Sequence, residues 1–185
     1  MEHSVVFAGF GGQGLLFAGQ VLARAAIRDG LEVFWIPSYG PEMRGGTASC
    51  TVIISDAPIG SPVVDRFEAA VLMNLPSLRK FAPHLAVGGL LVRNASLTFA
   101  ESAGRDDLNE CSLACTELAA SAGSDKSVSI VALGALVART GWVSETATRA
   151  ALSEMIGHKH PEMAAADLAA FAAGFEAASP TVPEP

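Results

Sequence analysis

Two stretches of the chain concentrate residues that could bind a ligand or a partner. The first is residues 9–14, GFGGQG, which follow an apolar run and precede a helical pattern. Glycine has no Cβ and accepts positive φ, so the backbone can turn sharply and another group can approach it closely. Such a turn before a helix presents free N–H groups and the positive end of the helix dipole. The pattern therefore predicts an anion-binding or partner-facing turn at Gly11, Gly12, Gln13 and Gly14.

The glycine turn also satisfies the G-x-G-x-x-G pattern of dinucleotide-binding proteins. That fingerprint expects Asp or Glu at the end of the second strand, where the carboxylate binds the ribose hydroxyls. Here the second strand ends Trp35-Ile36-Pro37-Ser38, without an acid, and Glu32 lies at its other end. We therefore expect the turn to serve contacts other than NAD or FAD, with a free-standing nucleotide-binding protein as the alternative.

The second stretch is residues 37–46, PSYGPEMRGG, which hold two prolines and three glycines and predict an irregular loop. The planar guanidinium of Arg44 could bind a phosphate or a carboxylate. Alternatively, Glu42 and Arg44 pair with each other and brace the loop. The candidate coenzyme-facing or partner-facing residues in this loop are Tyr39, Gly40, Glu42, Arg44, Gly45 and Gly46.

The other residues with reactive or metal-binding side chains are better explained by packing than by catalysis. A predicted helix over residues 110–122 places Cys111 and Cys115 on one face, where we interpret them as small buried hydrophobes. An iron–sulfur cluster needs four closely spaced cysteines. His158 and His160 fit an exposed junction between helices. Neither a nucleophile–base pair nor a G-x-S-x-G elbow occurs, so we predict no catalytic residue and no metal site in this chain.

The elements that must position the two stretches alternate between strands and helices. Strands are expected at residues 4–8, 31–36, 47–55, 69–73 and 90–93, and residues 85–89 are expected to turn. Helices are expected at residues 13–28, 76–83, 110–122, 128–139, 144–156 and 162–178. The first strand, helix and strand form a βαβ unit. We predict an α/β, Rossmann-like three-layer domain with a mainly parallel sheet and helices on both faces, whose two loops share one edge.

Composition narrows the function classes further. The 185 residues predict one domain over residues 1–178, followed by a Pro-rich tail at residues 179–185. A net charge of −7 argues against binding to nucleic acid or to an acidic membrane. The chain lacks a basic n-region and a long apolar run, and it has three cysteines, so we expect a cytoplasmic protein. With only 17% charged residues, part of its surface is expected to be covered by partners, and the isolated chain could form a homodimer.

The paired motifs resemble the gamma subunit of 2-oxoacid:ferredoxin oxidoreductases. They are GFGGQG at residues 9–14 and PSYGPEMRGGTASC at residues 37–50. The resemblance continues through IGSP at 59–62, MNLPSL at 73–78 and ALGAL at 132–136, so it covers most of the chain. The loop around residues 39–46 is most similar to the 2-oxoglutarate branch. Pyruvate, branched-chain and indolepyruvate relatives share the domain, so those substrates stay open as alternatives.

The resemblance implies one subunit of an oxidoreductase, inactive alone. Such complexes convert a 2-oxoacid and coenzyme A into an acyl-CoA (succinyl-CoA from 2-oxoglutarate) and carbon dioxide, and they reduce ferredoxin. Thiamine diphosphate with Mg²⁺ is implied for the alpha and beta subunits, and iron–sulfur clusters for a delta subunit or elsewhere. The gamma chain is implied to pack on these subunits and to contribute to coenzyme A access through the motif positions. A purely structural spacer is the third hypothesis.

Overall fold

A mixed sheet forms the centre of the computed structural model, which describes residues 1–39, 47–98, 101, 103–156 and 161–179. Within these residues the sheet has six strands in the order β2-β3-β1-β4-β5-β6. The strands are β1 Glu2–Phe10, β2 Glu32–Tyr39, β3 Thr47–Ser55, β4 Phe67–Leu72, β5 Leu85–Asn94 and β6 Asn109–Leu113. Strands β1, β4, β5 and β6 are parallel, whereas β3 is antiparallel to both of its neighbours. The predicted α/β class with a mainly parallel sheet is confirmed.

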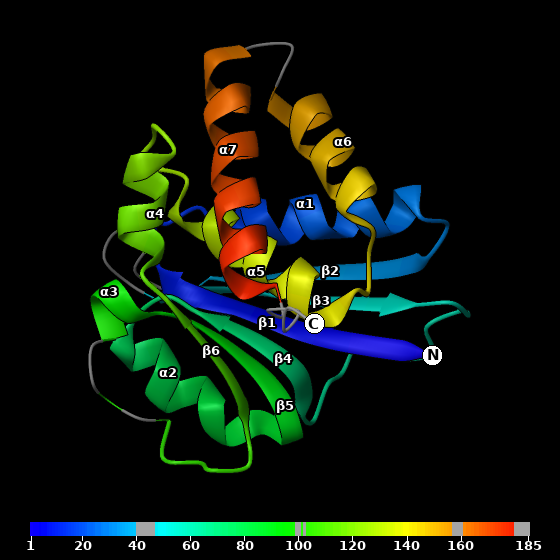
Figure 1. The fold of residues 1–185 in the computed structure, drawn as a ribbon. Coiled ribbons are helices and arrows are strands. Elements are labelled where there is room, and N and C mark those ends of the chain that lie inside the picture. The colour runs from blue at the N-terminus through cyan, green and yellow to red at the C-terminus, as the bar shows by residue number, and fades with distance from the viewer. Residues whose placement is uncertain (40–46, 99–100, 102, 157–160, 180–185) are drawn as a thin grey trace, which may run out of the picture.

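Helices cover both faces of the sheet (Figure 1). One face carries α1 Leu15–Arg28, α4 Cys115–Ser121, α5 Val128–Thr140, α6 Glu145–Ile156 and α7 Pro161–Ala178. The other face carries α2 Leu75–Phe81 and the 3₁₀ helix η1 Ala82–His84, while the short helix α3 Ala95–Thr98 follows β5. The three-layer arrangement is therefore as expected. Among the described helices, none is long and apolar enough to cross a membrane.

The hydrophobic core divides at the sheet because successive side chains of a strand point to opposite faces. Along β1, Val5 and Phe7 join the larger cluster with α1, α5, α6 and α7. Val6 and Ala8 join the smaller cluster beneath α2. The central strand therefore contributes to both halves of the core, and its carboxyl end is held firmly in place.

Helix α5 is the most deeply buried helix of the larger layer, as its nearly continuous apolar sequence predicts. Its backbone touches that of α7 because two glycines face the contact. A Cβ added to Gly134 would strike the carbonyl oxygen of Phe171, and one added to Gly174 would strike that of Val131. The close approach of α5 and α7 therefore requires glycine at both positions.

The predicted βαβ unit is split by an inserted strand. β3 lies between β1 and β2 and pairs with both in antiparallel fashion. The seven residues 40–46 that join β2 to β3 are too few for a parallel crossover, which needs a dozen or more residues. An antiparallel return is the available connection. The alternation of residues 47–55, which predicted a half-buried strand near the edge, thus belongs to the second strand of the sheet.

The predicted helix over residues 110–122 is wrong. Its first part is strand β6, in which Cys111 points inward while Glu110 is exposed, and α4 begins only at Cys115. Cys111 and Cys115 are both buried, but they do not share a helix face. The predicted turn at residues 85–89 is also part of a strand, since β5 starts at Leu85 with an irregular register opposite residues 67–69.

Asp167 is a buried acid between two helices of the larger layer. It lies on α7, and the hydroxyl of Ser127 at the start of α5 donates a hydrogen bond to its carboxylate. Burial raises the pKa of Asp167 above its ordinary value of 3.8, and the bond from Ser127 opposes that shift. The folded protein therefore binds a proton at Asp167 more tightly than the unfolded chain does.

We expect Asp167→Asn to change how stability depends on pH. Because the pKa is raised on folding, wild-type stability falls as pH rises from 3.8 through the folded-state pKa. Asparagine does not titrate and can still accept the bond from Ser127. The free energy of unfolding of the variant, relative to wild type, should therefore increase over that window in urea titrations. Asp125→Asn, at an exposed position, is the control, and identical pH profiles for both variants would contradict the assignment.

We expect Gly174→Ala to lower the free energy of unfolding by about 3 kcal/mol, since the new methyl group has to separate the backbones of α5 and α7. Gly60→Ala is the matched control, because nothing lies within 4 Å of the added Cβ. Its effect should stay within about 0.5 kcal/mol. Urea unfolding measures both variants. Equal stabilities would show that the helix contact is not tightly packed.

Candidate functional site

The two motif stretches leave the sheet at the same edge. Strands β1 and β2 run in the same direction, because each is antiparallel to β3. In the register of the sheet, Phe10 lies opposite Thr47 and Tyr39 lies opposite Ala48. The glycine turn and the two ends of the 40–46 connection are therefore neighbours at this edge. The candidates Gly40, Glu42, Arg44, Gly45 and Gly46 lie outside the described residues, as do His158 and His160.

The glycine turn has a backbone that favours glycine at two positions. Gly12 has φ 94° and Gly14 has φ 74°, both in the left-handed region. Gly14 is the N-cap of α1, and its carbonyl accepts the first helical hydrogen bond from the N–H of Ala18 at 2.9 Å. Gly11 and Gly12 are exposed. The turn thus presents backbone N–H groups at the positive end of α1.

Gln13 closes the turn with its side chain. Its Oε1 accepts a hydrogen bond from the N–H of Phe10 at 2.7 Å, and its own N–H donates to the carbonyl of Phe10 at 3.3 Å. Gly9 leaves room for this side chain, since a Cβ there would collide with Gln13 and would lie 2.6 Å from Leu15. The side-chain carbonyl of Gln13 is therefore engaged within the turn, and the turn keeps its shape through bonds of its own.

A second helix begins beside the turn. The hydroxyl oxygen of Ser129, in the first turn of α5, would lie 2.8 Å from a Cβ on Gly14. Ser129 is buried, and Ser127, the N-cap of α5, holds the carboxylate of Asp167. The N-termini of α1 and α5 thus converge at Gly14, and both favour negative charge there. Sequence reasoning missed this contribution, although Ser127 and Ser129 at the start of an apolar helical run were a visible sign.

Two asparagines hold the neighbouring strand ends at the same edge. Asn74, after β4, accepts the N–H of Ser77 at 2.8 Å and so caps α2. Asn94, at the end of β5, accepts the N–H of Cys115 at 3.2 Å and donates to Thr116 Oγ1 at 3.2 Å. Sequence reasoning missed both residues. Their bonds fix the loops that follow β4 and β5 at this edge.

The described cysteines do not fit an iron–sulfur cluster. Burial raises the pKa of the Cys50 thiol and of the Cys115 thiol to about 12, and it also raises the pKa of Cys111. Burial thus favours the protonated thiol at each of the three positions. In the described part of the chain, no group of three His, Cys, Asp or Glu residues is arranged to hold a metal ion. Among the described residues of this edge, no donor set for a cluster or for Mg²⁺ is brought together.

Comparison with curated proteins gives two informative relatives. The chain is 42% identical over 137 residues to "Ketoisovalerate oxidoreductase subunit VorA" of Methanothermobacter thermautotrophicus, a match that covers 74% of this chain and 28% of that protein. It therefore spans under a third of that relative's length. It is 33% identical over 183 residues to "2-oxoglutarate synthase subunit KorC" of Methanothermobacter marburgensis, covering 95% of this chain and 96% of that one.

Solved structures agree with this similarity. The gamma subunit of a keto/oxoacid ferredoxin oxidoreductase from Geobacter sulfurreducens has a TM-score of 0.82 and 32% identity, covering 95% of this chain and 98% of that one. The 2-oxoglutarate:ferredoxin oxidoreductase from Magnetococcus marinus, with 2-oxoglutarate, coenzyme A and succinyl-CoA bound, has a TM-score of 0.88 and 26% identity. That match covers 96% of this chain and 31% of the other.

The family model described as "Pyruvate ferredoxin/flavodoxin oxidoreductase" matches residues 4–177. The resemblance of the paired motifs to gamma subunits is confirmed by the full-length matches to KorC and to the Geobacter gamma subunit. This chain belongs to the pyruvate ferredoxin/flavodoxin oxidoreductase family, as a protein of the gamma-subunit type.

Proposed function

We propose that the chain is the gamma subunit of a complex that oxidises 2-oxoglutarate with coenzyme A to succinyl-CoA and carbon dioxide and passes the electrons to ferredoxin. The observation that carries the proposal is the end-to-end similarity to KorC, a 2-oxoglutarate synthase subunit of nearly the same length. The Magnetococcus 2-oxoglutarate enzyme supports the same substrate, since this chain matches 31% of that chain with a TM-score of 0.88. Alpha, beta and delta subunits would supply thiamine diphosphate, Mg²⁺ and the iron–sulfur clusters.

Ketoisovalerate is the second candidate substrate. The higher identity to VorA, 42% over 137 residues, favours it. That match leaves a quarter of this chain uncovered, whereas the KorC match extends over 95% of it. A sequence match over the full length is better evidence for a subunit with the same domain organisation, so 2-oxoglutarate is preferred.

We further propose that the edge with the glycine turn faces coenzyme A or the partner surface that binds it. Coenzyme A carries several phosphate charges, and the chain's net charge of −7 does not attract them broadly. Local groups must therefore provide the affinity. The N–H groups of Gly11, Gly12 and Gly14 at the start of α1 are suited to that role, and the first turn of α5 adds a second positive helix end.

The 40–46 loop would supply the side chains for this contact. Arg44 is the cation of the loop, and its guanidinium can bind phosphate through two parallel hydrogen bonds. Tyr39 and Thr47, which border the loop, are anchored within two residues of Phe10 in the sheet register. The loop is therefore attached at a point from which Arg44 could reach an anion at the glycine turn. Gly40, Glu42, Gly45 and Gly46 are proposed to shape and orient it.

We expect the tagged chain, purified from the organism that makes it, to bring down larger subunits that contain thiamine diphosphate and iron–sulfur clusters. With the 2-oxoacid at limiting concentration, this complex should reduce ferredoxin at least about tenfold faster with 2-oxoglutarate than with ketoisovalerate or pyruvate. The chain alone should show no turnover. Faster turnover of ketoisovalerate would transfer the assignment to the branched-chain enzymes. Tight binding of NAD or FAD by the isolated chain, without partners, would support the free-standing alternative instead.

The coenzyme A role predicts that charge changes at the edge act on coenzyme A specifically. Arg44→Ala removes a cation, and Gln13→Glu adds an anion while its carboxylate can still accept the N–H of Phe10. Each should raise the KM for coenzyme A in the complex by about tenfold, with the KM for the 2-oxoacid unchanged. Arg24→Ala and Gln20→Glu, on α1 away from the turn, are matched controls. If coenzyme A kinetics match wild type in both edge variants, the edge serves packing alone.

A further inference from the structure

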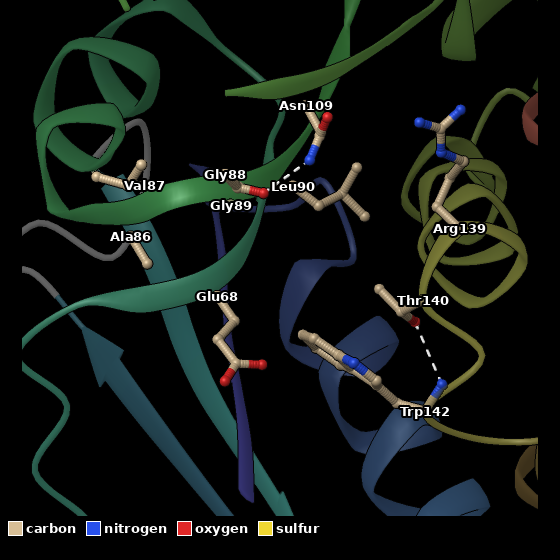
Figure 2. A pocket seen from close by; sticks show the side chains of 10 residues that line it. All are labelled: Glu68, Ala86, Val87, Gly88, Gly89, Leu90, Asn109, Arg139, Thr140 and Trp142. Atoms are coloured by element: carbon tan, nitrogen blue, oxygen red, sulfur yellow. Dashed lines mark hydrogen bonds between the residues drawn. The ribbon is translucent and has the colours of Figure 1, made fainter. Parts of the chain in front are cut away.

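A cavity of about 490 Å³ opens at the edge of the sheet opposite the glycine turn (Figure 2). Its walls are the first residues of β4, β5 and β6 on one side and the last turn of α5 with Trp142 on the other. Ala86, Val87 and Leu90 give the β5 wall an apolar surface, and Val87 is 83% exposed. The coenzyme A proposal does not account for this cavity, because its lining residues lie outside the paired motifs.

Arg139 supplies a positive charge to this cavity. It is exposed on the last turn of α5 and, among the described residues, makes no hydrogen bond or ion pair. Figure 2 shows its guanidinium turned away from Glu68, on the side of the cavity where Asn109 lies. Glu68 is itself engaged, since His3 Nδ1 lies 2.7 Å from its Oε2. An anion that enters on the β6 side would therefore meet a guanidinium that can form charge-assisted hydrogen bonds.

Helix α7 brings the end of the described chain to the same edge. At the start of α5, Ser127 donates to Asp167 in the first half of α7. Further along, a Cβ on Gly134 would meet the backbone of Phe175. The two helices therefore run in the same general direction (Figure 1), and α7 also contacts β6. Ser179, where the described residues end, lies about 6 Å beyond Phe175 and so level with the last turn of α5.

The residues that follow α7 have a sequence suited to this cavity. Residues 180–185 read PTVPEP and lie outside the described residues. Proline fixes φ near the extended polyproline value, so such a segment loses little conformational entropy when it docks. Six residues at about 3.1 Å each span about 19 Å. Because the axes of contacting helices lie about 8–10 Å apart, this segment can reach from the end of α7 to the cavity at the end of α5. Its charged side chain, Glu184, is an acid.

We propose that residues 180–185 of the chain itself dock in this cavity, with the carboxylate of Glu184 on Arg139 and Val182 against the apolar β5 wall. The charges are complementary, since the segment carries an acid and the cavity carries a base that the described residues leave unpaired. The volume lies within the range of small-ligand sites, which suits a segment of a few residues. Attachment to α7 keeps the segment at a millimolar effective concentration, so a weak contact is enough to hold it. The docked segment would strap α7 to β5 and β6, independently of the proposed coenzyme A edge.

NMR relaxation of the full chain tests the proposal through the backbone amides of Val182 and Glu184. Their order parameters should exceed about 0.6, the level below which a backbone is flexible. Arg139→Gln and Glu184→Gln should each lower them below that level, because each removes one half of the ion pair. Arg24→Gln, at an exposed cation on α1, is the matched control and should leave them unchanged. Exchange of the two charges, Arg139→Glu combined with Glu184→Arg, should restore the order.

A peptide PTVPEP, added to a chain that ends at Ser179, should bind with a dissociation constant of about 1 mM and about tenfold more weakly after Arg139→Gln. Its binding should shift the amide signals of Gly88, Leu90 and Asn109 at the cavity. The proposal is overturned if residues 182 and 184 are flexible in the wild-type chain, which would leave the cavity to a partner protein. It is equally overturned if Arg139→Gln leaves their order unchanged or if the charge exchange fails to restore it. None of these readouts depends on ferredoxin reduction, so failure of the oxidoreductase assignment would be distinguishable.

Discussion

The antiparallel pairing of β3 between β1 and β2 is the constraint on which the rest of the structure depends. Its register sends Cys50, Val52 and Ile54 into the larger core beneath α1. A slip by one residue would turn all three to the other face and break their packing in this core, so that packing sets the register. The same register places Phe10 opposite Thr47, and hence the two motif stretches at one edge. Packing in the core thus determines where the two motif stretches lie relative to each other.

Helix α5 runs from one edge of the sheet to the other and links the two. It begins at Val128, with Ser129 beside Gly14, and ends at Thr140, which lines a cavity at the opposite edge together with Trp142. A single helix dipole therefore favours negative charge at the glycine turn and positive charge at the opposite edge. The backbone contact at Gly134 and Gly174 fixes the helix along its length. Both edges take their electrostatic character from one element that is itself buried.

The sequence predicted secondary structure well where the spacing of apolar residues is regular over a long segment. The helices α1, α5 and α7 and the buried strands follow from their apolar spacing. Gly30, just after α1, has a left-handed φ of 79°, which glycine adopts readily. β6 could not be separated in this way, because five residues of alternation run directly into a helical pattern at Cys115. The insertion of β3, and the contacts of Ser129 and Asn94 at the edge, arise from pairings between distant segments. No local pattern encodes them, so they required coordinates.

The chemistry available at the glycine-turn edge supports a binding role that other subunits must complete. In the described residues, the side chains at this edge already serve the fold: Gln13 closes its turn, Asn94 joins β5 to α4, and Ser127 holds Asp167. The cysteines are buried, with raised thiol pKa values. Within the described residues, the groups left to meet a ligand are chiefly the backbone N–H groups at two helix starts, which can stabilise negative charge. This chemistry fits the proposed function, in which the reacting groups come from partner subunits.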